Sequence, residues 1–123
     1  MHPDLVKVVR ASFDDWTRDG LSFIVTEGLR TSERQAELYK VAATKTLNSR
    51  HLSGHAVDLA VTLNNGALWD WPLYYRLAAV MKSNALRLGV GITWGGDWPT
   101  FKDGPHYELN WKDYPIEGSR LTA

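Results

Sequence analysis

The sequence predicts an α+β domain in which an antiparallel sheet is backed by helices. Two stretches carry apolar residues at helical spacing, and several short β-prone runs are bounded by turn signals. Helices and strands do not alternate in regular βαβ units, so a parallel sheet is not expected. The length of 123 residues suits one domain, residues 1–123, with a single core and no room for an independent binding domain.

The first part of the chain is expected to form two helices around one strand. Residues 5–16 have apolar side chains at helical spacing, and Gly20 is suited to end that helix. The β-branched and aromatic residues of 21–26 predict a strand. Ser32 and Gln35 have the spacing of a capping box, which predicts a second helix to about residue 43.

The second part of the chain is expected to form the rest of the sheet and one more helix. Asn64-Asn65-Gly66 is a strong hairpin signal. Apolar spacing over 73–88, followed by Gly89, predicts a long helix with a glycine stop. Three β-prone runs are expected to form strands, at residues 56–62, 90–94 and 105–109.

Composition argues against several kinds of partner. The 14 basic and 14 acidic residues balance, which removes the electrostatic footprint expected of a nucleic-acid or polybasic membrane binder. The absence of cysteine leaves only His, Asp or Glu to hold a metal. No stretch approaches the roughly 18 apolar residues of a membrane span, and the N-terminus does not resemble a signal peptide. We therefore expect synthesis in the cytoplasm.

The stretch from Ser49 to Asp58 resembles half of a metal site. His51 and Asp58 flank Gly54, which permits a close backbone approach. Asp58 is the only charge in an apolar β-prone run, and a buried unpaired charge costs several kcal/mol. The carboxylate therefore needs a hydrogen-bonding, cationic or metal partner.

Asp103-Gly104-Pro105-His106 supplies the other half. His106 and Glu108 should share one face of a strand, because side chains alternate, while Tyr107 points the other way. Two histidines and one aspartate form a tetrahedral zinc site that leaves a position for water, as catalytic zinc sites do. A nearby carboxylate that does not bind the metal would act as general base.

A competing interpretation pairs His51 with His55 on a helix. Leu52 then stands where a helical zinc motif of that kind needs its catalytic glutamate, and Gly54 disfavours a helix there. His55 is therefore expected to be a loop residue near the site.

Two motifs occur together here, Ser49-x-His51-x-x-Gly54-x-Ala56-x-Asp58 and Asp103-x-Pro105-His106-Tyr107-Glu108. They resemble the M15 family of zinc peptidoglycan peptidases. Gly28-Leu29-Arg30 with Gln35, Phe101, and the loop at 94–98 resemble the branch that contains phage L-alanyl-D-glutamate endolysins. The resemblance covers roughly residues 20 to 111 and implies a Hedgehog/DD-peptidase-like fold.

The resemblance also implies roles for individual residues. It makes His51, Asp58 and His106 the zinc ligands and Asp103 the catalytic base. It places three further residues in the substrate site, Arg30, Gln35 and Ser49. Arg30 would polarise the scissile carbonyl or hold a substrate carboxylate, although a structural salt bridge is the alternative. Gln35 and Ser49 would bind the substrate backbone, or else act as a helix cap and a loop brace.

Three more side chains are open to a functional interpretation. Glu108 would fix the tautomer of a zinc-bound histidine, unless it is an ordinary strand charge. Trp94 and Trp98 flank a Gly-Gly loop and would wall a substrate groove.

The expected function is hydrolysis of the L-Ala–D-Glu bond in the peptidoglycan stem peptide by a zinc metallopeptidase, as in a phage endolysin. The alternatives are a D-alanyl-D-alanine carboxypeptidase of the same family and a non-catalytic zinc or wall-binding module. Asp103 favours the endopeptidase, because the carboxypeptidases typically carry Glu there. We expect a monomer without a separate cell-wall-binding domain. It would be made in the host cytoplasm and reach the wall in the periplasm after release by a holin.

Overall fold

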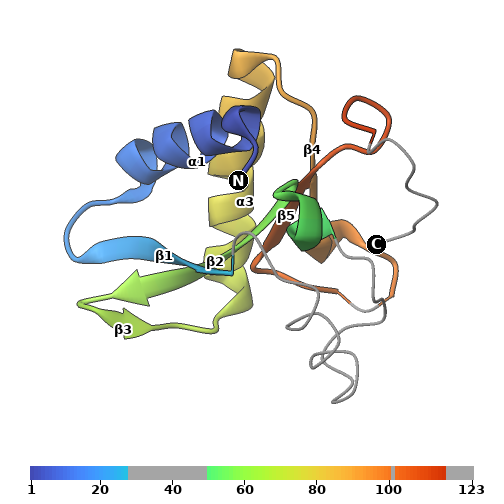
Figure 1. The fold of residues 1–123 in the computed structure, drawn as a ribbon. Helices are drawn as coiled ribbons and strands as arrows, with labels where there is room; N and C mark the ends of the chain where they lie inside the picture. Colours follow the sequence, from blue (N-terminus) through green and yellow to red (C-terminus); the bar gives the residue numbers. More distant parts are fainter. Residues whose placement is uncertain (28–49, 101, 116–123) are drawn as a thin grey trace.

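A computed structural model describes residues 1–27, 50–100 and 102–115 (Figure 1). Its elements in chain order are α1 (Pro3–Trp16), β1 (Leu21–Glu27), η1 (Arg50–Ser53), β2 (Ala56–Leu63), β3 (Gly66–Ala67), α3 (Trp71–Leu88), β4 (Ile92–Trp94), η2 (Gly95–Asp97) and β5 (His106–Leu109). The helix expected from Ser32 to about residue 43 lies outside the described residues.

The strands form one antiparallel sheet in the order β1-β2-β5-β4, and β3 adds to β2 through a hairpin. The hairpin turns at Asn64 and Asn65, whose φ angles are 49° and 69°. Two consecutive residues with positive φ are typical of the type I′ turn that the Asn-Asn-Gly sequence predicts. The predicted fold class, an antiparallel sheet backed by helices, is confirmed.

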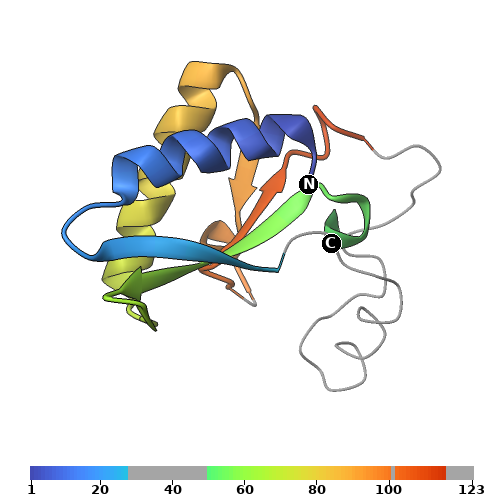
Figure 2. The same cartoon turned by 60° about the vertical axis from the view of Figure 1, so that its left-hand side comes forward.

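Helices α1 and α3 pack against each other and cover one face of the sheet (Figures 1 and 2). The core lies between these helices and the sheet. Leu5 and Val8 of α1 and Leu77 and Met81 of α3 are among the fully buried side chains there. α3 ends where predicted, because Gly89 adopts φ 71° and its N–H donates to the carbonyls of the last turn.

Alternation along the strands separates the core from the opposite face of the sheet. Val57 and Leu59 of β2 and Tyr107 of β5 point into the core beneath the helices. Asp58 and His106 are offset from them by one residue, so their side chains lie on the other face. Within the described residues, no helix is both long enough and apolar enough to span a membrane.

Candidate metal centre and active site

The site begins with a cross-strand pair on the face of the sheet that the helices leave uncovered. Asp58 of β2 and His106 of β5 are direct partners in the antiparallel register. His106 Nδ1 lies 3.1 Å from Asp58 Oδ1. The one charged residue in an apolar strand therefore meets an imidazole from the neighbouring strand, which answers the predicted need for a partner.

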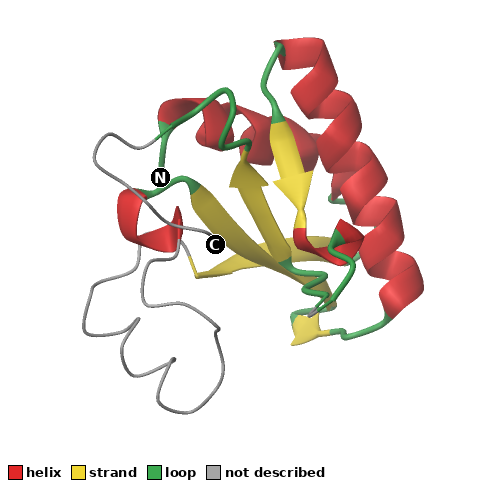
Figure 3. Ribbon diagram, turned by 90° about the vertical axis from the view of Figure 1, so that its right-hand side faces the viewer, coloured by secondary structure: helices red, strands yellow, loops and turns green. Residues whose placement is uncertain are grey.

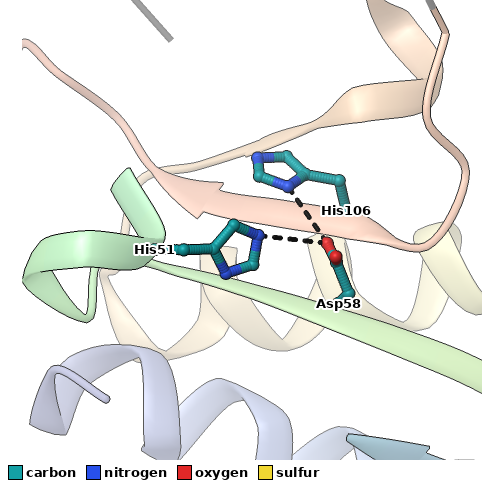
Figure 4. A group of neighbouring side chains, drawn as sticks. All are labelled: His51, Asp58 and His106. Carbon is teal, nitrogen blue, oxygen red and sulfur yellow. Dashed lines mark hydrogen bonds and ion pairs between the residues drawn. The ribbon is translucent and has the colours of Figure 1, made fainter. Parts of the chain in front are cut away.

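His51 reaches the same carboxylate from the short helix η1. Its Nε2 lies 3.3 Å from Asp58 Oδ1, and its ring packs edge-on against the ring of His106 (Figure 4). The turn after η1 depends on Gly54, which adopts φ 77° and accepts a backbone hydrogen bond from His2. A Cβ on Gly54 would lie 3.3 Å from the backbone of Met1, so the close approach predicted for this glycine is confirmed.

The charges of the three side chains are coupled. Burial alone would raise the pKa of Asp58, but hydrogen bonds with His106 and His51 hold that pKa well below its usual range. Burial alone would lower the pKa of His106, but hydrogen bonds with Asp58 and Glu108 raise it to about 9. The group therefore holds a proton that an incoming cation would replace.

The geometry of the three side chains fits a zinc ion. One ligand atom from each of His51, Asp58 and His106 can be chosen so that all three lie within 4.8 Å of one another. Two donors about 2.0–2.1 Å from a tetrahedral zinc are separated by about 3.3 Å. The two His–Asp separations are 3.3 and 3.1 Å, which matches that spacing. The donor set of two imidazoles and one carboxylate is that of a zinc site with an open position.

His106 is held on its remaining sides by Glu108 and Trp98. Its Nε2 lies 2.8 Å from Glu108 Oε1, and both side chains are buried. This contact confirms that residues 106 and 108 share one face of the strand. The Trp98 ring packs 5.0 Å from the imidazole, centroid to centroid. The Nδ1 atom therefore stays directed at Asp58.

Asp103 approaches the site through the turn at Gly95. The Asp103 N–H donates to the Gly95 carbonyl at 3.0 Å, and the His106 N–H donates to the Asp103 carbonyl at 3.2 Å. A methyl group on Gly95 would lie 3.0 Å from His106 Cβ and 3.1 Å from Asp103 Cβ. The Cβ atoms of Asp103 and His106 thus both lie beside Gly95. Because glycine has no side chain, the two residues can come close together there.

Comparison with known proteins identifies the family. Residues 1–110 match the family model described as phage L-alanyl-D-glutamate peptidase. The chain belongs to this family. The predicted resemblance to zinc peptidoglycan peptidases of the endolysin branch is therefore confirmed.

Two curated relatives support the family assignment. The L-alanyl-D-glutamate peptidase of Listeria phage A118 is 35% identical over 112 residues, which cover 90% of this chain and 39% of the relative. The peptidoglycan L-alanyl-D-glutamate endopeptidase CwlK of Bacillus subtilis is 36% identical over 104 residues, covering 73% of this chain and 62% of CwlK. The chain thus spans less than two thirds of the length of either relative.

Solved structures of related peptidases share the fold. The L-Ala D-Glu endopeptidase ChiX of Serratia marcescens superposes with a TM-score of 0.87 at 40% identity, covering 94% of this chain and 85% of ChiX. The vancomycin resistance D,D-pentapeptidase VanY, solved in complex with Zn(II), superposes with a TM-score of 0.58 at 20% identity, covering 89% of this chain and 72% of VanY. The predicted DD-peptidase-like fold is confirmed.

The remaining predicted site residues fall into two groups, those outside the described residues and one that is buried. Arg30, Gln35 and Ser49 lie outside the described residues. Trp94 does not match its expected place in a groove wall, because it is 2% exposed and pairs with Tyr107 in the sheet, on the side of the helices. Its indole N–H instead donates to the Gly104 carbonyl at 2.6 Å and braces the loop that precedes His106.

Arg50, which the sequence motifs do not single out, links η1 to β5. Its side chain is 0% exposed, Nη2 donates to the Leu109 carbonyl at 2.8 Å, and the guanidinium stacks 4.0 Å above Trp111. Burial lowers the pKa of Arg50, and the negative charge of Glu108 opposes that effect. Arg50 thus ties the segment carrying His51 to the strand carrying His106. The sequence signal that could have pointed to Arg50 is its place between two predicted site residues, Ser49 and His51.

Proposed function

We propose that this chain is a zinc metallopeptidase that hydrolyses the L-Ala–D-Glu bond of the peptidoglycan stem peptide. The convergence of His51, Asp58 and His106 on one point carries the proposal. The family match and the likeness to ChiX, an L-Ala D-Glu endopeptidase, supply the bond specificity.

His51 Nε2, one oxygen of Asp58 and His106 Nδ1 would hold the zinc. A bound zinc supplies Lewis acidity, which polarises a peptide carbonyl and lowers the pKa of water. Glu108 accepts the remaining N–H of His106 at 2.8 Å, so its role is to keep Nδ1 directed at the metal. The Trp98 ring packs against the same imidazole.

Asp103 would be the general base. It removes a proton from the attacking water and returns it to the leaving amine. Its position three residues before His106 supports this role, because the Cβ atoms of Asp103 and His106 both lie beside Gly95. Arg30, Gln35 and Ser49 would bind the substrate, with Arg30 engaging a carboxylate or the scissile carbonyl.

The cellular role follows from the same proposal. A phage protein of this kind would be made in the host cytoplasm and act on the wall in the periplasm after a holin releases it. We propose that it acts as a monomer and without contact to nucleic acid or membrane.

Digestion of purified peptidoglycan tests the proposed activity. Mass spectrometry should detect peptides beginning with D-Glu, with L-Ala left on the glycan. Release of free D-Ala alone would instead assign a carboxypeptidase. A protein that binds zinc but cuts nothing would be a binding module.

A further inference from the structure

Three aromatic side chains at the start of α3 are exposed to solvent. The exposed fractions are 67% for Trp69, 43% for Trp71 and 55% for Tyr75. Large aromatic residues bury 150–250 Å² each when covered, so this group, which we call the aromatic surface, is a candidate for binding a partner.

The aromatic surface rests on rigid parts of the fold. Trp71 and Tyr75 lie one turn apart on α3, and their rings pack 6.4 and 5.2 Å from the ring of buried Trp94. Trp69 stacks parallel to Tyr74 at 5.9 Å, with an interplanar angle of 2°. The rings are thus set in place before any ligand arrives, which lowers the entropic cost of binding.

The aromatic surface adjoins the loop that enters the candidate active site. A Cβ on Gly104 would lie 3.2 Å from the Trp71 ring, and Gly104 is the residue after Asp103. Figure 3 shows the first turn of α3 beside η2 at this end of the sheet. Gly104 is two residues from His106, and two residues span at most about 7 Å. A ligand on these rings would therefore lie near the first residue of β5, His106, which belongs to the candidate metal centre.

The chemistry of the proposed substrate places a sugar a short distance from the scissile bond. In peptidoglycan the L-Ala of the stem peptide is attached to the glycan strand, so one residue separates the scissile bond from the sugar. One residue spans at most about 3.6 Å, to which the linker to the sugar adds its own length. The glycan is therefore within reach of the loop at 103–105 when the bond is cut.

We propose that the aromatic surface binds the glycan strand of peptidoglycan, with N-acetylated hexose rings stacked on Trp69, Trp71 and Tyr75. This inference rests on the proposed function. The C–H edges on one face of a sugar ring complement the negative face of an indole or phenol ring. Asp70 lies between Trp69 and Trp71 in the sequence and makes no side-chain cap to α3, and Arg76 follows Tyr75. Both side chains are exposed, so they are available to bond sugar hydroxyl and acetamido groups.

A second copy of the chain is the other occupant to consider. The cores of protein interfaces are depleted in charged residues, whereas Asp70 and Arg76 are exposed sequence neighbours of these aromatic residues. Charged groups beside aromatic rings instead suit a ligand that is itself amphipathic and rich in hydroxyl groups.

Two substrates that differ only in the sugar test the proposal. We would compare kcat/KM for a stem peptide still attached to its disaccharide with kcat/KM for the same peptide without sugar. The wild-type protein should prefer the disaccharide-linked peptide. Trp69→Ala and Tyr75→Ala should each reduce that preference about threefold or more, through a higher KM. Leu86→Ala removes an 85% exposed apolar side chain elsewhere on α3 and should keep the wild-type preference.

Calorimetric titration with peptide-free glycan strands separates this proposal from the proposed activity. Binding by the wild type that weakens in Trp69→Ala and Tyr75→Ala supports the aromatic surface even if neither peptide is cut. Equal binding by all variants, or an equal loss of activity on both peptides, would overturn it. A concentration-dependent dimer that these substitutions abolish in sedimentation would assign the surface to a second copy and also overturn it.

Discussion

Asp58 is the residue on which the candidate metal centre converges. Its Oδ1 lies within 3.3 Å of a nitrogen from His51 and within 3.1 Å of one from His106, although the histidines are 55 residues apart in sequence. A carboxylate in this position offers one anionic donor between two neutral ones. In the proposed function each residue of the site has a separable role, either in holding metal or in moving a proton.

Replacing either histidine should remove the metal. His51→Ala and His106→Ala each leave two donors of three, so we expect zinc content to fall from about one ion per chain to near zero. Metal analysis of the purified variants measures this. His55→Ala is the matched control, because His55 Nδ1 contacts Ser53 and not the site. Zinc loss in His55→Ala with retention in His106→Ala would favour the His51–His55 pair instead.

Replacing Asp103 should remove activity and leave the metal in place. Asp103→Asn keeps the shape of the side chain but cannot accept the proton of the attacking water, so kcat should fall about 10²-fold or more. Zinc content and the melting temperature should stay near wild type. Asp97→Asn makes the same chemical change at an exposed residue paired with Lys82 and should retain activity. Full activity of Asp103→Asn would make Glu108 the next candidate base.

At the scale of elements, the turn from β4 into η2 determines how closely Asp103 and His106 approach each other. Trp94 pairs with Tyr107, and the next residue, Gly95, accepts the N–H of Asp103. Strand pairing thus brings the loop at 95–97 against the loop at 103–105, although no short sequence motif connects the two loops.

Adding a methyl group at Gly95 should disturb that meeting. In Gly95→Ala the new Cβ would lie 2.4 Å from the Asp103 carbonyl oxygen, so the backbone must shift. Overpacking of this kind costs about 1–3 kcal/mol, and we expect a lower melting temperature together with a lower kcat. Gly66→Ala is the control, since its Cβ would meet only Leu63 at 3.5 Å. Wild-type kcat and stability in Gly95→Ala would contradict the assigned role of this glycine.

At the scale of the whole molecule, the candidate metal centre joins side chains from η1, β2 and β5, of which β2 and β5 are already paired in the sheet. η1 precedes β2, and His106 begins β5, so zinc bound there would link both to Asp58. The tail after β5 is anchored separately, because the Tyr114 hydroxyl donates to Asp4 Oδ2 of α1 at 2.6 Å.

Removing zinc should lower the stability of the folded chain. A ligand at 100 times its Kd stabilises the folded state by about 2.7 kcal/mol, which corresponds to about 10 °C in the melting temperature of a domain of this size. Calorimetry with and without a chelator measures the shift. The chelator should leave the melting temperature of His106→Ala unchanged, and an equal shift there would mean that it acts elsewhere.

The anchor of the tail should weaken at alkaline pH. The hydrogen bond to Asp4 raises the pKa of Tyr114 from 10.0 to about 12. The neutral phenol is therefore favoured in the folded state, and its contribution is complete below pH 10 and lost as pH rises towards 12. The difference in melting temperature between the wild type and Tyr114→Phe should shrink over that window. A constant difference would show that ionisation of Tyr114 does not affect folding.

Local signals in the sequence were sufficient for much of this protein. Apolar spacing and the glycine stop determined α3, the Asn-Asn-Gly turn determined the β2–β3 hairpin, and the isolated charge of Asp58 indicated a buried partner. These features depend on residues close together in the chain. The ligand motifs were recognisable for the same reason, since each lies within ten residues.

Contacts between distant strands were decided only by the tertiary structure. The sequence placed Trp94 in a substrate groove, but its pairing with Tyr107 turns it under the helices and makes it a brace for Gly104. Arg50, to which no sequence motif pointed, is buried with its guanidinium against Leu109 and Trp111. The face to which a side chain points changes with a shift of one residue in strand register, and register is set by partners far along the chain.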